Sequence, residues 1–489
     1  MYQKYLKPAH HMSQRCTWNK YSYKPRFALL YILSISLLVG CKKFIEVDPP
    51  ITGYVSKTVY ENGAQASAAV TSVYIRMIWG SNGLSSGDES ISLLGALSAD
   101  ELDAYHTAGS PQLEFYHNAL RSNNRAVSNK WEQFFELIYS CNAAIEGLNN
   151  SSSVSPSLKQ QLVGEAKFMR AFLYFYATNL WGNTPLILTT DYQKNRLFER
   201  NSVKQIYEQI VTDLLDAQTL LSDEYMTPDN KATGERVRPN KWAAKALLAR
   251  VYLYSKDWTN AEIQSTSIIE KRSLFSLVPD LNQVFLNSST EAIWQLQPVA
   301  PDRNTFEGDT YILTAIPGVA QKVAISPFLL DAFEPGDNRL ANWVGTFNGF
   351  HYPYKYKIRG TGAPLSEFLM VLRLAEQYLI RAEARAHLGN TAGAVTDLNM
   401  IRSRAGLNKI STMPVDNLLK SIIHERQIEL FMEWAHRWFD LKRTGSIDGT
   451  MANVMEHKGG SWLPNWELYP IPQTELDQAP NLRPQNSGY

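Results

Sequence analysis

Three acidic side chains lie close together in the segment LSADELDAYH, namely Asp100, Glu101 and Asp103. Two carboxylates can act as the acid and the base of glycoside hydrolysis when they flank a sugar ring. Closeness in the sequence does not fix their separation in space, and an acidic, solvated loop is the commoner explanation. We therefore predict no catalytic role for them. A milder hypothesis is that Asp103 accepts hydrogen bonds from sugar hydroxyls beside Tyr105.

The pair His424-Glu425 begins like the helical zinc-protease pattern, which needs a second His four residues after the first. Position 428 is Ile, so no zinc site is expected. Four charged residues that follow are spaced for ion pairs along a helix: Arg426, Glu429, Glu433 and Arg437. Together with His436, Asp440 and Arg443, they are expected to form one polar surface. No phosphate-binding loop, dinucleotide fingerprint or nucleophile elbow is present either. We predict no catalytic residue, metal or cofactor.

Aromatic side chains are the best candidates for ligand contacts, since the chain has 25 Tyr, 19 Phe and 12 Trp. The C–H groups of a sugar pack on an aromatic face, while its hydroxyls need Asn, Asp or Arg. Any single aromatic residue is more often part of the core, but one or two of four should face the ligand. The predicted ligand-binding residues are Trp79, Asn82, Asp103, Tyr105, Trp294 and Trp343.

The first forty residues are typical of a secretory leader. Residues 27–39 (FALLYILSISLLV) are apolar and follow Lys24 and Arg26. They end at Gly40-Cys41, which resembles a lipobox, so we predict a lipoprotein signal peptide over 1–40 and lipidation at Cys41. An uncleaved anchor or a plain secretion signal is the alternative, and Met12 is a second possible start. With Cys16 removed and Cys41 acylated, Cys141 has no intrachain partner and is expected in the core.

Charge also limits the function. The whole chain has a net charge of +1, and residues 1–40 carry six basic and no acidic residues. The mature chain is therefore acidic, at about −5, which gives no electrostatic reason to bind nucleic acid.

The rest of the chain predicts a mostly α fold with a few short strands. We expect a lipidated tether over 41–60 and one composite domain over 61–489. That domain divides into an N-terminal helix and loops (61–130), helical pairs (131–271), a loop-rich insertion (272–360), and helical pairs with a C-terminal tail (361–489). Small residues recur on facing helices, as at Ala375 and Ala394, which is typical of tetratricopeptide-like pairs. Aromatic and polar residues alternate in HYPYKYKI (351–358), which predicts a strand.

Several motifs, in order, resemble the SusD/RagB family of Bacteroidetes outer-membrane lipoproteins. They are FIEVDP after the lipobox (44–49), GEAKFMRA (164–171), LWGNTPL (180–186), AAKALLARVY (243–252), RLAEQYL (373–379), LNMIR (398–402), RAGL (404–407), HERQIEL (424–430), HRWFDLKR (436–443), YPIPQ (469–473) and QNSGY (485–489). Ser487 departs from the family, which often has Pro there.

The resemblance implies a tetratricopeptide-like scaffold that carries an irregular ligand-binding lobe. It also implies a SusC-like TonB-dependent transporter as partner and a surface position on the outer membrane. The ligand is usually a glycan or oligosaccharide, and some relatives bind peptides. We therefore predict a non-catalytic nutrient-binding lipoprotein. Peptide binding on the same architecture, a secreted glycosidase and a scaffold without a small ligand remain as alternatives.

Overall fold

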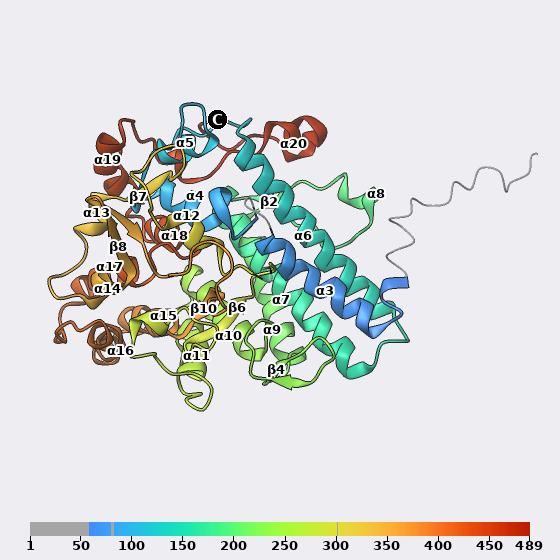
Figure 1. Ribbon diagram of the computed structural model, residues 1–489. Coiled ribbons are helices and arrows are strands. Elements are labelled where there is room, and N and C mark those ends of the chain that lie inside the picture. Colours follow the sequence, from blue (N-terminus) through green and yellow to red (C-terminus); the bar gives the residue numbers. More distant parts are fainter. Residues whose placement is uncertain (1–57, 80–82, 301) are drawn as a thin grey trace, which may run out of the picture. The chain divides into compact units, whose positions relative to one another are not determined.

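Long helices pack on one another in a row that follows the chain, as the computed structural model shows for residues 58–79, 83–300 and 302–489. The predicted leader, Cys41, most of the tether and Asn82 lie outside these described residues. Figure 1 shows α3, α6 and α7 side by side at the start of the row. The row consists of α3 (Gly63–Ile78), α6 (Arg125–Asn150), α7 (Pro156–Trp181), α9 (Val203–Leu220), α10 (Lys241–Tyr254), α11 (Trp258–Ile269), α15 (Leu374–His387), α16 (Thr391–Arg404) and α17 (Val415–Glu429).

Local sequence sets where these helices begin and end. Asn240 caps α10, because its side-chain oxygen accepts the backbone N–H groups of Trp242 and Ala243 at 3.1 Å each. Gly182 ends α7 with a φ of 73°, which suits a residue without a Cβ. The mostly helical fold with a few short strands is confirmed. Cys141 is buried and free, as expected for a core residue.

A long insertion separates α11 from α15, and two of its strands pair with each other in the protein interior. β6 (Ala292–Leu296) pairs antiparallel with β10 (Leu369–Arg373), which leads directly into α15. Helical pairs were expected over 361–489, but this region opens with a strand, because Leu369–Arg373 form β10. All residues of both strands are buried, so their apolar run carries no alternation that would separate a strand from a helix.

The remaining elements are short, and they gather before α6, within the insertion and after α17. The strand pairs are β1 (Leu102–Ala104) with β7 (Val323–Ile325), β2 (Thr184–Pro185) with β3 (Arg200–Asn201), β4 (Tyr225–Met226) with β5 (Ala232–Thr233), and β8 (Val344–Phe347) with β9 (Phe350–Pro353). The short helices are η2 (Gly87–Glu89), α4 (Ile91–Ser98), α5 (Pro111–Tyr116), α8 (Tyr192–Asn195), η3 (Leu281–Gln283), α12 (Phe306–Tyr311), α13 (Pro327–Leu330), α14 (Asn338–Trp343), α18 (His436–Arg443), α19 (Ile447–Lys458), η4 (Pro464–Glu467), α20 (Gln473–Gln478) and η5 (Pro480–Leu482).

Buried ion pairs join the insertion to the helical row. Glu429 of α17 contacts Arg339 of α14 at 3.0 Å, Arg373 of β10 at 2.5 Å, and Arg404 of α16. Burial opposes ionisation of Glu429, but the three guanidinium groups outweigh it and hold its pKa well below the ordinary value. We call Glu429 and these three arginines the arginine cluster.

The prediction of a polar surface here was wrong in one respect. The charged residues do form ion pairs, but most of the side chains, Glu429, His436 and Asp440 among them, are buried. Arg426 donates to Asp440 at 2.7 Å inside the protein. Helical spacing identifies which residues can pair and does not show which face of the helix is covered.

Among the described residues, no helix combines the length and the apolar character needed to cross a bilayer.

Candidate ligand-binding sites

Asp103 and Tyr105, two of the predicted site residues, lie at the β1–β7 strand pair. Side chains two residues apart along a strand point to the same side. Asp103 Oδ1 accepts the Tyr116 hydroxyl at 3.2 Å and lies 2.8 Å from Nε2 of His457. The backbone N–H of Tyr105 donates to the carbonyl oxygen of Lys322 at 2.7 Å, which extends the strand pairing by one residue.

The ring of Tyr105 contacts Phe350, the first residue of β9, with ring centroids 5.9 Å apart and planes at 89°. Phe350 follows the two-residue turn Asn348-Gly349, where both φ angles are positive, at 49° and 82°. This pattern is that of a type I′ hairpin turn. Farther along the chain, Tyr352 and Tyr354 form a second edge-to-face pair at 5.7 Å.

Five residues therefore define a partly exposed surface, which we call the hairpin face: Asp103, Tyr105, Phe350, Tyr352 and Tyr354. Half-buried rings beside a carboxylate suit a ligand with both C–H faces and hydroxyl donors. The last three residues were not among the predicted site residues. The Asn-Gly pair between two alternating segments was the signal that could have identified them.

Trp79 remains a candidate. It follows the last turn of α3, and 65% of its surface is exposed. An exposed indole face is available to pack against the C–H groups of a ligand.

Trp294 and Trp343 must be removed from the predicted site, because both are fully buried. Trp294 of β6 packs edge-on against Phe168 and Phe172 at 5.1 and 5.4 Å. Trp343 of α14 donates its indole N–H to the carbonyl oxygen of Leu281 at 2.9 Å. Both indoles pack in the protein interior and present no surface to a ligand.

The prediction that Asp100 and Glu101 lie in an acidic, solvated loop was wrong. Asp100 is 3% exposed and accepts both Nε and Nη2 of Arg437, at 2.8 and 2.6 Å. Glu101 is 1% exposed and accepts the backbone N–H of Met432 at 3.0 Å. Burial raises the pKa of Glu101 to about 8. These two carboxylates are occupied by the protein and cannot flank a sugar ring.

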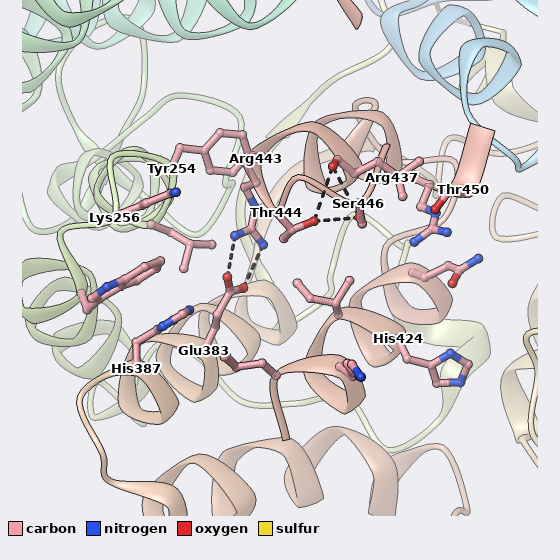
Figure 2. Close-up of a pocket in the computed structure, with 17 residues that line it drawn as sticks. Tyr254, Lys256, Glu383, His387, His424, Arg437, Arg443, Thr444, Ser446 and Thr450 are labelled. Carbon is pink, nitrogen blue, oxygen red and sulfur yellow. Dashed lines mark hydrogen bonds and ion pairs between the residues drawn. The ribbon is translucent and has the colours of Figure 1, made fainter. Parts of the chain in front are cut away.

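A separate cavity of about 560 Å³ lies among α10, α11, α15 and α17–α19. Figure 2 shows the Glu383–Arg443 pair near its centre, Lys256 and His387 on one side, and His424 and Arg437 on the other. Trp258 and His387 stack in one wall, with ring centroids 3.9 Å apart and planes at 9°. We call it the helical cavity.

A larger groove of about 930 Å³ adjoins α9, α10 and α18 and shares Tyr254 and Arg443 with the helical cavity. Its lining includes Tyr207, Tyr252 and Leu468. Among the described residues, no group of three or more His, Cys, Asp and Glu side chains is arranged to hold a metal ion.

Two family models match the chain. One, described as "SusD family", matches residues 328–489, and another, described as "Starch-binding associating with outer membrane", matches residues 89–253. Together they cover more than half of the sequence.

Individual relatives agree with these models. A "SusD-like protein" of Bacteroides ovatus is 27% identical, over 84% of this chain and 81% of its own length. "Starch-binding protein SusD" of Bacteroides thetaiotaomicron is 23% identical, over 66% and 72%.

Solved structures show the same fold. A SusD superfamily protein of Bacteroides vulgatus has a TM-score of 0.76 at 23% identity and covers 88% of this chain and 99% of its own. A "Laminarin binding SusD-like protein" has a TM-score of 0.72 at 24% identity and covers 87% and 99%.

Proposed function

The chain belongs to the SusD/RagB family, and from this premise we propose that it is a non-catalytic receptor, lipid-anchored to the outer membrane, that binds a glycan and delivers it to a SusC-like TonB-dependent transporter. The observation that carries the proposal is the match of both family models, in order, to the helical row and the segments around it. The names of two relatives, a starch-binding and a laminarin-binding protein, make α- and β-glucans the first ligands to test.

The hairpin face supplies the contacts in this proposal. The rings of Tyr105 and Phe350 offer apolar surface to the C–H groups of a sugar. Asp103 accepts hydrogen bonds from sugar hydroxyls and is held in place by Tyr116 and His457. The rigid helical row holds these irregular segments in position, as a scaffold holds binding loops.

The carboxylates near the hairpin face are not arranged for hydrolysis, which supports delivery of an intact glycan. A retaining or inverting glycosidase needs two carboxyl groups on opposite sides of the scissile bond. Asp100 and Glu101 are turned inward and bonded to Arg437 and to the backbone of Met432. Only Asp103 of the three is partly exposed.

Binding is tested by isothermal titration of the mature protein with laminarin and amylose fragments, followed by incubation and analysis for new reducing ends. We expect the protein to bind at least one glycan and to produce no new reducing ends. Binding of a peptide panel and no glycan would replace the ligand class, and release of shorter sugars would refute the non-catalytic role.

The anchor is tested in cells grown with a clickable palmitate analogue. The wild-type chain should carry the label and be recovered with the outer membrane. Cys41→Ser should lose the label, because no thiol remains at the acylated position. A Cys141→Ser variant is the control and should keep it. Equal labelling of wild type and Cys41→Ser would contradict lipidation at this residue.

A further inference from the structure

We propose that the helical cavity is a second saccharide-binding site, selective for sugars that carry a carboxylate or a sulfate ester. It shares no residue with the hairpin face. Such a site rests on the proposed glycan binding and adds to it a second place on the protein for a different class of sugar.

Polar side chains without a partner converge on this cavity. Within the part of the chain that the structure describes, no hydrogen bond or ion pair involves the side chains of Lys256, Lys420, His424 or Gln427. A pocket with a few uncommitted polar groups is the ordinary form of a small-ligand site. Its volume of about 560 Å³ lies within the usual range for such sites.

The charge that remains in the cavity is positive. Arg443 is neutralised by Glu383, with Nη1–Oε1 and Nη2–Oε2 distances of 2.5 and 2.8 Å, and by Asp440. Arg437 is paired with Asp100. Burial lowers the pKa of both His387 and His424, so neither adds charge at pH 7. The two exposed lysines are left to attract an anion.

Lys256 is held by the backbone and does not depend on a flexible loop. It lies in the turn between α10 and α11 with a φ of 60°. Its N–H donates to the carbonyl oxygen of Leu253 at 3.1 Å, and the next residue, Asp257, caps α11 through the N–H of Asn260 at 3.2 Å. The backbone of Lys256 is thus fixed beside the Trp258–His387 stack, and its exposed side chain extends from there.

Hydroxyl groups line the opposite part of the cavity. Thr444 Oγ1 donates to the carbonyl oxygen of Asp440 at 2.7 Å and lies 2.8 Å from Oγ of Ser446. These contacts occupy the single O–H donor of each residue, and since each oxygen has two lone pairs, acceptor capacity is left for sugar hydroxyls. An aromatic wall, short hydroxyls and a Gln amide together match the mixed surface of a saccharide.

An acidic peptide fits less well. All lining residues lie on helices or at their ends, so no strand edge is present to pair with an extended peptide. An amphipathic helix would need a continuous apolar groove, whereas the apolar side chains of this cavity are mixed with two lysines, two histidines and several hydroxyl groups.

The test is titration of the full mature protein with four probes: trigalacturonate, a sulfated carrageenan oligosaccharide, maltotriose as the neutral trisaccharide, and hexaglutamate as the acidic peptide. We expect binding of one or both acidic sugars that weakens as NaCl is raised, because exposed charges are screened. The double variant Lys256→Gln/Lys420→Gln should weaken it at least tenfold. The two acidic sugars distinguish carboxylate from sulfate recognition.

The matched control is Lys194→Gln/Lys409→Gln, which removes two exposed lysines outside the cavity and should leave the affinity unchanged. Circular dichroism of every variant checks the fold. No binding of either acidic sugar, equal loss in both double variants, or tighter binding of hexaglutamate would overturn the proposal.

Failure of the acidic-sugar site would leave the proposed binding of neutral glycans at the hairpin face untouched. Loss of neutral glucan binding on Tyr105→Ala reports on the hairpin face alone. If Tyr105→Ala abolished the binding of acidic sugars too, the helical cavity would not be a second site.

Discussion

Replacing Glu429 by Gln tests whether the arginine cluster holds the insertion on the helical row. Oε1 of Glu429 accepts Arg373 and Arg404, and Oε2 accepts Arg339. An amide keeps the shape but turns one acceptor into a donor. Whichever way the amide is oriented, its NH₂ group faces at least one guanidinium group, and three buried cations lose a shared counter-charge.

The expected cost follows from these contacts. Loss of one charge-assisted hydrogen bond costs about 1.5–3 kcal/mol, and breaking a buried ion pair by removing one partner typically costs about 3–5 kcal/mol. Each arginine keeps another carboxylate, for example Glu433 beside Arg373 and Asp337 beside Arg339. We therefore expect the free energy of unfolding to fall by about 3 kcal/mol, near the lower end of the buried-pair range.

The assay is guanidinium denaturation followed by tryptophan fluorescence, with calorimetry to check cooperativity. The control is Glu456→Gln, an exposed residue of α19 for which no ion pair occurs among the described residues, and it should change stability by less than about 0.5 kcal/mol. The folded-state pKa of Glu429 is depressed, so its contribution is present above the unfolded pKa and is lost as the pH falls through the folded value. The difference between wild type and Glu429→Gln should therefore shrink in acid. Equal stability of the two proteins at pH 7 would refute the reasoning.

Two further predictions concern residues that contact the segment 431–436, namely Gly95 and Glu101. Gly95→Ala should destabilise the protein by about 1–3 kcal/mol, because the added Cβ would lie 2.2 Å from Cβ of Ala435. The double variant Gly95→Ala/Ala435→Gly should recover part of this stability, since it removes the clashing Cβ from a residue with a φ of 58°. No recovery in the double variant would contradict the contact. Glu101→Gln should leave stability unchanged or increase it at pH 8 and above. The pKa of Glu101 in the folded protein, about 8, is raised above its unfolded value. The stability that the protonated acid contributes is therefore lost as the pH rises from the unfolded pKa through 8. An unchanged slope of stability against pH over this interval would show that Glu101 is not the titrating group.

Much of the fold could be predicted because the long helices carry strong local signals. The N-terminal helix expected within 61–130 is α3, and α10 and α11 form one of the helical pairs expected within 131–271. Helical pairs were expected from residue 361 onward, but β10 precedes α15 as a continuous apolar run. Such a run fits a buried strand and a buried helix equally.

The site was harder to predict because residue type does not show burial. From the sequence alone, Trp294 and Trp343 were as good candidates for ligand contacts as Trp79, yet of these three only Trp79 is exposed. Asp100 is buried because of Arg437, more than three hundred residues away in the sequence. Tyr105 and Phe350 meet because β7, which pairs with β1, also contacts β9. Contacts of this range depend on the complete fold.

The most direct test of the central claim is glucan binding by the mature protein and by Tyr105→Ala, with Tyr192→Ala as the control for loss of an exposed tyrosine elsewhere. We expect wild type and Tyr192→Ala to bind laminarin or amylose fragments equally and to release no shorter sugars. Tyr105→Ala should bind at least tenfold more weakly, a loss of about 1.4 kcal/mol or more. Unchanged affinity in Tyr105→Ala, or accumulation of cleaved glucan, would contradict the account.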